Sequence, residues 1–135
     1  MYEHEWVCRW DHVDIAQRAY FPRLVNAMHQ AGEAFMEEIG WPYGENPSEH
    51  GMMLPIVEIG SDFERPVGLG DRIAIEVEVE MGNSSLRLEF SGRNEDGDVA
   101  FTGFEQHVCV PTDEDRAIPL PDDFRAAVET SGASR

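Results

Sequence analysis

The sequence contains no lysine, so all ten of its basic residues are arginines. Against them stand 27 Asp and Glu residues, which give a formal net charge of -17. A surface this acidic repels the phosphates of nucleic acids and of anionic membranes, so the composition argues against both as partners. Because salt screens the repulsion between like charges, a halophilic protein is one hypothesis, with ordinary acidic composition as its alternative.

Long apolar runs and a targeting segment are also missing. No stretch approaches the roughly 20 apolar residues that cross a bilayer. The first ten residues, MYEHEWVCRW, lack the basic and apolar blocks of a secretory signal. We therefore expect a cytoplasmic protein.

Cysteines are few, and none has metal-ligand spacing. Cys8 and Cys109 lie far apart, each within an apolar run. This arrangement favours two buried, reduced thiols over a disulfide. The histidines also lack a spacing that suggests a metal, so we expect no metal site.

The length and apolar content are typical of one folded domain. A chain of 135 residues with 41% hydrophobic composition can bury a single core. We expect that domain to cover residues 1–129. The polar end TSGASR, residues 130–135, is expected to fray.

One amphipathic pattern predicts a long helix over residues 22–39. Its apolar positions from Leu24 to Phe35 recur at spacings of four, three and four residues. A proline suits its first turn, and Gly40 can end it in a left-handed conformation. Gly32 inside the helix costs about 1 kcal/mol relative to alanine. We therefore expect another segment to pack closely there.

Strand patterns lie on both sides of this helix. The predicted strands cover residues 2–10, 52–64, 71–81, 84–93 and 99–111. The third of them alternates apolar and acidic residues without a break, which predicts one buried and one exposed face. Gly-Asn and Asp-Gly pairs in the last two connections indicate tight hairpins. Pro55 puts the second strand at a sheet edge or a bulge. A short helix can follow Pro121.

This order predicts an α+β architecture: a five-stranded antiparallel sheet wrapped around one long central helix. The apolar face of the sheet must be buried, and only the 22–39 helix is large enough to cover it. An outer strand still leaves an unpaired edge, which a second copy covers most simply. We therefore expect a homodimer or a dimer of dimers.

Four stretches then carry a family resemblance. They are DIAQRAYFP at 14–22, FERPVGLGD at 63–71, SSLRLEF at 84–90 and RAIPLP at 116–121. Through them, roughly residues 5–125 resemble the hotdog-fold acyl-CoA thioesterases of the 4-hydroxybenzoyl-CoA thioesterase type. The resemblance implies a hotdog fold and an enzyme that hydrolyses an acyl-CoA to a carboxylic acid and free CoA. It implies no metal or organic cofactor, and it leaves open the acyl group and an acyl-carrier protein in place of CoA.

The resemblance also implies catalytic positions. The catalytic aspartate of the family falls on Asp14, as nucleophile or general base, and its oxyanion-binding backbone N–H falls on Phe21. A helix N-terminus offers unpaired N–H groups and partial positive charge, which suits a developing oxyanion. Without the resemblance, Asp14 could be an exposed loop carboxylate. Asp11 is expected at the surface, and His12 either orients Asp14 or faces solvent.

The sequence departs from the family just after this aspartate. Relatives often have glycine where this chain has Gln17 and Arg18. Gln17 is a candidate to reach the attacking water or the thioester, and Arg18 to reach a phosphate; two solvated side chains are the alternative. If these residues have spoiled the site, the chain would be a non-catalytic hotdog module that binds an acyl or aromatic ligand.

The remaining candidates are arginines for the CoA phosphates and one helix carboxylate. Arg65, Arg72 and Arg87 are candidate phosphate contacts, because an acidic protein must concentrate positive charge locally to hold a polyanion. Each is more often a solvated or salt-bridged strand residue. Glu33 occupies the helix, where other hotdog thioesterases use a carboxylate, but its spacing assigns it to the polar face.

Overall fold

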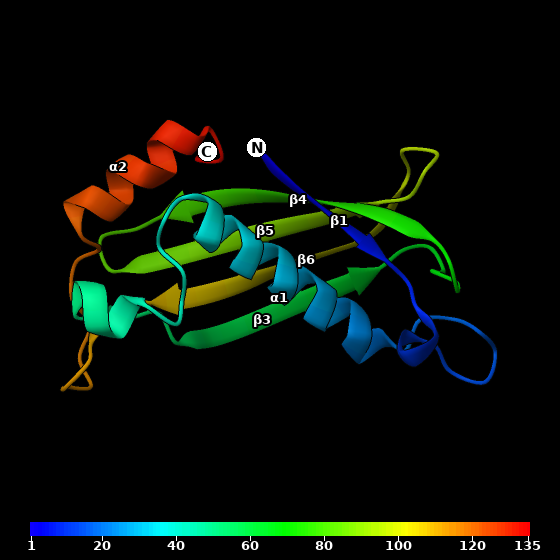
Figure 1. Ribbon diagram of the computed structural model, residues 1–135, viewed down its shortest axis with the longest axis horizontal. Helices are drawn as coiled ribbons and strands as arrows, with labels where there is room; N and C mark the ends of the chain where they lie inside the picture. Colours follow the sequence, from blue (N-terminus) through cyan, green and yellow to red (C-terminus); the bar gives the residue numbers. More distant parts are fainter.

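The computed structural model describes all 135 residues and is built on one five-stranded antiparallel sheet. Its strands are β1 (Tyr2–Val7), β3 (Ile56–Phe63), β4 (Arg72–Met81), β5 (Ser85–Arg93) and β6 (Val99–Val108), in the order β1-β4-β5-β6-β3. Strands β4, β5 and β6 form a meander. Strand β3 precedes β4 in the chain but pairs with β6 at the far edge (Figure 1).

Helix α1 (Phe21–Glu38) lies across one face of this sheet (Figure 1). The buried residues of α1 are Leu24, Ala27, Met28, Ala31, Gly32, Phe35 and Met36. The inward residues of the central strands, among them Ile75, Val77 and Leu88, are fully buried beneath it. Burying each such side chain contributes about 1.5–3 kcal/mol, so this layer forms the core. The α+β hotdog arrangement is confirmed.

The ends of α1 follow from local sequence. Tyr20 is the residue before the helix and gives no side-chain cap, while Pro22 occupies the first turn. At the other end Gly40 adopts φ +85°, a conformation that costs glycine nothing. The observed limits differ by one residue from the predicted ones.

Gly32 is a contact point, as predicted. A Cβ atom at this position would lie 2.9 Å from Leu88 Cδ1 on β5, nearer than two carbon atoms normally approach. The missing side chain therefore allows the helix to approach the sheet, which explains a glycine inside α1.

Smaller elements complete the chain. The 3-10 turn η1 (Trp10–His12) follows β1, the π-turn η2 (Asn46–His50) follows α1, and α2 (Asp122–Ser131) lies near the C-terminus. Strands β2 (Met52–Met53) and β7 (Val110–Pro111) form a separate short ladder. The predicted strand over 52–64 is therefore two strands, broken at Pro55, and a register shift follows between Ile56 and Glu58.

The C-terminal tail is ordered, contrary to the prediction that residues 130–135 fray. Ala133 is buried, and the Arg135 N–H donates to Val79 O at 2.9 Å. The Arg135 guanidinium lies 2.7 Å from Glu78 and 2.6 Å from Glu89. The tail reaches these two strand carboxylates because α2 turns it back over β4, which a local sequence pattern cannot reveal.

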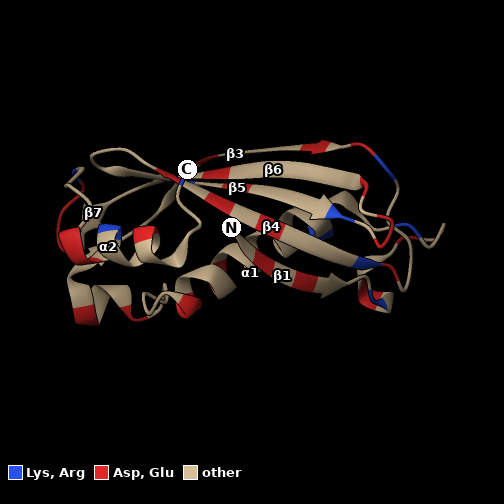
Figure 2. Cartoon of the chain, turned by 90° about the horizontal axis from the view of Figure 1, so that it is seen from above, with Lys and Arg blue, Asp and Glu red and all other residues tan.

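The distribution of charged residues and the state of the two cysteines agree with what the composition indicates. Acidic residues are spread over the strands and helices, with only scattered arginines between them (Figure 2). Cys8 and Cys109 are buried free thiols, as predicted. None of the helices combines the length and apolar character needed to cross a bilayer.

Candidate active site

The loop between η1 and α1 closes on itself at the start of the helix. Val13 bridges Ala19, and the Tyr20 N–H donates to His12 O at 2.8 Å. The loop is also tied to the segment before β4, because the Ala19 N–H donates to Val67 O at 2.7 Å. Its backbone is therefore held in place although its side chains are exposed.

Asp14 begins this loop and organises it. One of its carboxylate oxygens, Oδ1, accepts N–H donors from Ala16 at 2.9 Å and Arg18 at 3.3 Å. The other oxygen, Oδ2, has no protein partner. Asp14 is exposed in the single chain and lines a hollow of about 360 Å³ together with Trp10, Val13, Ile15 and Gln17.

The N-terminus of α1 presents an unpaired donor beside this loop. Phe21 is the first helical residue, and its N–H finds no acceptor within the chain. Asp14 pairs with Arg18 across the loop, and the three residues from Arg18 to Phe21 span at most about 11 Å. A free carboxylate oxygen and a free helix N–H therefore lie at the same end of the molecule.

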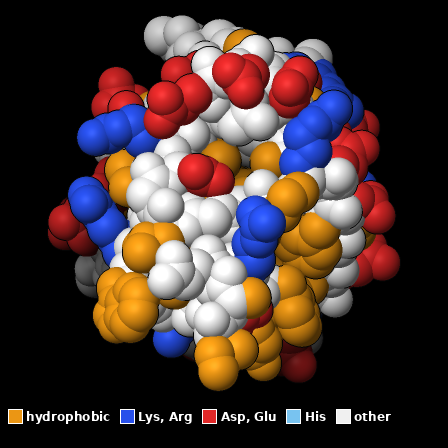
Figure 3. Space-filling view, turned by 90° about the vertical axis from the view of Figure 1, so that its right-hand side faces the viewer, with side chains coloured by type: hydrophobic (Ala, Val, Ile, Leu, Met, Phe, Trp, Pro, Cys, Tyr) orange, Lys and Arg blue, Asp and Glu red, His pale blue; other side chains and the backbone are white.

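This end of the molecule is rich in exposed apolar side chains. Trp10, Ile15, Tyr20, Phe21, Phe63 and Leu69 are all exposed. Figure 3 shows this end with hydrophobic surface interleaved with basic and acidic groups. An unusually apolar surface around a polar pair is typical of a binding site rather than of a solvated face.

Gln17 adopts φ +60°, the only non-glycine residue of the chain with positive φ. Its N–H donates to Asp14 O at 2.9 Å, and its own carbonyl accepts the Leu69 N–H at 3.2 Å. This left-handed backbone is one that glycine adopts at no cost and that other residues rarely adopt. Gln17 is exposed and its amide has no side-chain partner, so it remains a candidate to meet a substrate.

The four arginines predicted to contact CoA separate into two groups. Arg18 lies in the loop, and Arg65 and Arg72 flank the segment that this loop contacts. Arg87 lies on β5, where it pairs with Glu89 at 3.0 Å and stacks 3.8 Å from the Phe104 ring centroid.

Of these four arginines, only Arg18 has a side chain without a protein partner. Arg72 pairs with Glu5 at 2.6 Å, and Arg65 donates to Val99 O. Arg72 and Arg87 are therefore salt-bridged strand residues, the alternative that their sequence context favoured.

His12 takes neither of the two roles considered for it. Its Nδ1 accepts the Arg9 N–H at 2.8 Å, and its ring packs 4.8 Å from that of Trp6. It therefore supports the η1 turn and does not contact Asp14. Asp11 is exposed, as expected, with its carboxylate 3.7 Å from His12.

Comparison with known proteins identifies the family of this chain. The family whose sequence pattern matches residues 8–128 is the thioesterase-like superfamily. The chain belongs to the thioesterase-like superfamily. A match over nearly the whole chain identifies it as a hotdog acyl-CoA thioesterase, an enzyme that hydrolyses thioesters.

Individual relatives agree with this assignment. The 1,4-dihydroxy-2-naphthoyl-CoA hydrolase of Synechococcus elongatus is 30% identical over 123 residues, covering 90% of each chain. The 1,4-dihydroxy-2-naphthoyl-CoA thioesterase of Synechocystis has the same fold, with a TM-score of 0.86, 21% identity and 93% of each chain covered. A gentisyl-coenzyme A thioesterase is 25% identical at a TM-score of 0.81, covering 95% of this chain and 99% of that one.

This thioesterase also holds a buried polar cluster that sequence reasoning did not find. His29 on α1 lies with Nδ1 2.8 Å from Glu105 Oε2 on β6. His107, two residues further along β6, lies with Nε2 3.4 Å from Glu105 Oε1 and donates from Nδ1 to Leu54 O at 2.8 Å. Glu105 and His107 are 5% and 1% exposed, so both groups are inside the protein.

The charged groups in this cluster shift one another's pKa values. The hydrogen bond to Glu105 raises the pKa of His29 above its usual value, and this outweighs burial, which lowers it. Burial alone would raise the pKa of Glu105, but the nearby His107 and the hydrogen bond to His29 hold it below its usual range. Burial, with the charges of Glu105 and Glu33, raises the pKa of Tyr43. The carboxylate is thus kept ionised beside His29.

A signal for this cluster exists in the sequence. Strand β6 places Glu105 and His107 on its inward face, while Phe104 and Val108 face outward. This reverses the apolar-in alternation of β4. A strand whose polar residues face the core marks a buried polar site.

The cluster borders a pocket of about 470 Å³, here called the His29 pocket. Its walls are His29, Glu33, Tyr43, Pro47, Met53, Leu54, Pro55, Ile56 and His107. The rings of His29, Tyr43 and His107 lie nearly parallel at successive centroid distances of 6.0 Å and 5.9 Å. Glu33 is exposed, as its helical spacing indicated, but it faces this pocket.

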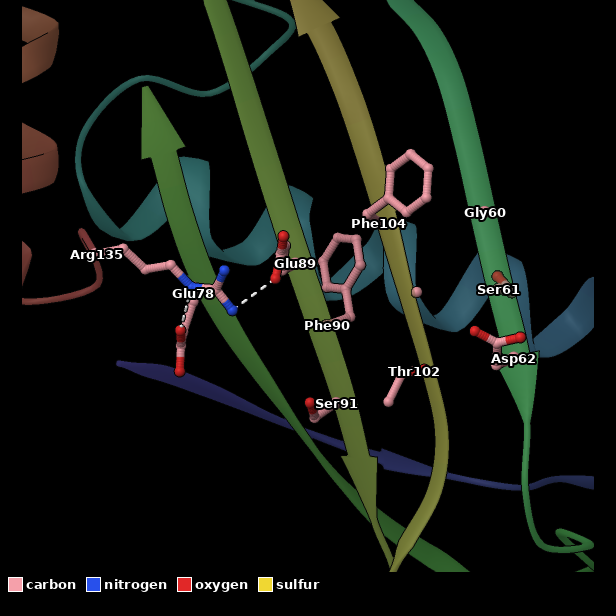
Figure 4. Close-up of a pocket in the computed structure, with 11 residues that line it drawn as sticks. Gly60, Ser61, Asp62, Glu78, Glu89, Phe90, Ser91, Thr102, Phe104 and Arg135 are labelled. Carbon is pink, nitrogen blue, oxygen red and sulfur yellow. Dashed lines mark hydrogen bonds and ion pairs between the residues drawn. The ribbon is translucent and has the colours of Figure 1, made fainter. Parts of the chain in front are cut away.

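The opposite face of the sheet has a different character. A hollow of about 460 Å³ there is lined mainly by small or charged residues, with Arg135 bound to Glu78 and Glu89 at one side (Figure 4). Helix α1 lies behind the sheet in this view, so this hollow is on the face of the sheet that α1 does not cover.

Proposed function

We propose that this thioesterase hydrolyses the CoA thioester of a hydroxylated aromatic acid, with Asp14 as its catalytic carboxylate and the Phe21 N–H as its oxyanion donor. The observation that carries the proposal is that two unpaired groups, Asp14 Oδ2 and the N–H of Phe21, lie at the same end of the fold. A carboxylate and a positive helix end are what acyl transfer from a thiol requires.

The reaction follows from these groups. The Phe21 N–H would bind the thioester carbonyl oxygen and stabilise its negative charge as the carbon becomes tetrahedral. One such donor contributes on the order of 3–4 kcal/mol in the transition state. Asp14 would either take a proton from the attacking water or attack the carbon itself, which gives an anhydride that water then hydrolyses. In both cases the C–S bond breaks, and CoA leaves as a thiolate that needs no strong acid.

Substrate class is supported by the relatives and by the chemistry of the surface. The relatives are named for 1,4-dihydroxy-2-naphthoyl-CoA and gentisyl-CoA, both of which carry a hydroxylated aromatic acyl group. Exposed aromatic side chains next to Asp14 suit the face of such a ring. Arg18 is free to meet a phosphate of CoA, and Gln17 to meet the water or the thioester. The relatives' names favour this enzyme over a non-catalytic ligand-binding module.

The test is Asp14→Asn assayed with 1,4-dihydroxy-2-naphthoyl-CoA and a thiol reagent. Asparagine keeps an Oδ1 that can accept the Ala16 and Arg18 N–H groups, so the loop should hold its shape. We expect kcat to fall by about a hundred- to ten-thousandfold. Asp11→Asn, the same change three residues earlier, should leave kcat unchanged. Full turnover in Asp14→Asn would eliminate this mechanism.

A further inference from the structure

Three pairs of side chains from α1 and β3 mark a line from the catalytic end to the His29 pocket. Phe21, Val25, His29 and Glu33 are four residues apart, so they share one ridge of α1. Phe21 contacts Phe63 on β3 at a ring distance of 6.1 Å, Val25 shares a small hollow with Ile59, and His29 shares its pocket with Ile56. We call this line the α1–β3 seam.

The length of the seam fits an aromatic acyl group. His29 lies eight residues after Phe21, which is a rise of about 12 Å along the helix. Helical side chains lean toward the N-terminus, so the imidazole lies nearer to Phe21 than this rise. An acyl group whose carbonyl lies at the Phe21 N–H can therefore direct the far edge of its ring toward His29.

The buried cluster leaves His29 with one defined polar atom for a ligand. Its Nδ1 faces a carboxylate and must therefore donate, so Nε2 is the ring nitrogen without a protein partner. Nε2 accepts a hydrogen bond from a hydroxyl when the ring is neutral and donates one to an oxygen when the ring is charged. In either state it pairs with a ring hydroxyl and has nothing to pair with on a bare aromatic ring.

His107 has no evident purpose in the core other than to hold Glu105. Its Nδ1 donates to Leu54 O, and its Nε2 lies 3.4 Å from Glu105 Oε1, where the two atoms face each other as an ion pair without a hydrogen bond. Apolar residues at these two inward positions would give comparable stability, since burying charged groups is costly even when they are paired. The chain Leu54–His107–Glu105–His29 instead fixes one ring at the pocket wall.

We infer that Glu105 and His107 are positioning residues that fix the orientation and tautomer of His29, and that His29 Nε2 recognises a ring hydroxyl of the acyl group. This inference rests on the proposed function, because it assumes that the acyl group lies along the α1–β3 seam. It adds a basis for choosing between hydroxylated and unsubstituted aromatic thioesters.

The selectivity between a hydroxylated and an unsubstituted aromatic thioester tests the inference. In the unmodified enzyme, kcat/KM for 1,4-dihydroxy-2-naphthoyl-CoA should exceed that for 2-naphthoyl-CoA. His29→Phe keeps an aromatic ring but removes both nitrogens, so this ratio should fall about tenfold, the equivalent of one hydrogen bond. Glu105→Gln should lower it several-fold, and Glu37→Gln, the same change on the outer side of α1, should not. An unchanged ratio in His29→Phe would overturn the inference.

Binding of the free acids separates this inference from the proposed function. If no thioester is hydrolysed, the affinities for 1,4-dihydroxy-2-naphthoate and 2-naphthoate can still be measured by calorimetry. Preference for the hydroxylated acid that is lost in His29→Phe would support the pocket although the proposed function had failed. Equal affinities, or no binding of either acid, would overturn it.

A spectroscopic measurement needs no variant and therefore survives if Glu105→Gln does not fold. Nitrogen-15 NMR of the histidines should find neutral His29 as the Nδ1–H tautomer. The groups that face it are Glu105, Glu33, Tyr43 and His107. Its pKa should lie above the ordinary histidine value. The Nε2–H tautomer would contradict a donor bond to Glu105.

Discussion

Gln17 determines the shape of the loop that presents Asp14, and it does so against its own backbone preference. Its φ of +60° is a conformation that costs most L-residues about 1–2 kcal/mol. The strain persists because hydrogen bonds to Asp14 and Leu69 fix the peptide groups on both sides. Strained backbone beside a candidate catalytic carboxylate is consistent with a functional demand on the loop.

Gln17→Gly should therefore raise stability. We expect a gain of about 0.5–1 kcal/mol in the free energy of unfolding, measured in urea, because relief of strain exceeds the added freedom of the unfolded chain. Ala16→Gly, at a neighbouring residue with ordinary φ, should instead lose a similar amount. If both changes destabilise equally, Gln17 is not strained. Thioesterase activity of Gln17→Gly would also report whether the amide takes part.

At the scale of elements, glycines decide how closely helix and strands approach. Gly103 on β6 faces α1 and β3 together, and a Cβ there would lie 2.6 Å from Met28 Sδ and 2.9 Å from Gly60 O. The second of these atoms belongs to the backbone of β3 and cannot move aside as a side chain can. The α1–β3 seam therefore depends on this missing side chain.

Gly103→Ala should destabilise the protein by about 1–3 kcal/mol, because an added carbon in a close-packed contact forces backbone shifts. Chemical unfolding measures this directly. Gly44→Ala is the matched control, since no atom lies within 4 Å of a Cβ there and its φ is not positive. Its free energy of unfolding should be unchanged or slightly higher. Equal stabilities of the two variants would contradict the close contact.

At the scale of the whole molecule, the edge of β3 is the most conspicuous exposed feature. Ile56, Val57, Ile59 and Phe63 are 42%, 61%, 55% and 46% exposed along this strand, which pairs with β6 on one side and is unpaired on the other. An apolar open edge invites pairing with another strand. We propose that a second copy of the chain pairs there, which would also enclose the α1–β3 seam.

Ile59→Lys tests this pairing by placing a charge on the proposed interface. Sedimentation equilibrium should give a dimer or a multiple of it for the unmodified chain and a shift toward monomer for the variant. Glu3→Lys introduces the same side chain on β1, the opposite edge of the sheet, and should leave the mass unchanged. A monomeric unmodified chain at micromolar concentration would contradict the proposal.

The effect of salt on stability, expected from the net charge of -17, also stays a prediction.

Much of the fold could be predicted because the local periodicity of apolar residues indicates its helices and strands. The alternation in 71–81 and the helical spacing after Leu24 each require one buried face, and a short chain has only one way to bury both. The roles of Asp14 and Phe21 came instead from a resemblance to a known family, carried by consecutive residues, and they stay predictions. In each case neighbouring positions carry the information.

Tertiary structure alone decided what depends on residues far apart in sequence. The exchange of β3 to the far edge, the attachment of Arg135 to Glu78 and Glu89, and the meeting of His29 with Glu105 across 76 residues have no local pattern. Each of these contacts depends on which parts of the sheet stay uncovered after α1 has packed on it. The sequence by itself determined the elements, whereas packing determined which distant polar groups became partners, because burial makes an unpaired charge too costly to leave.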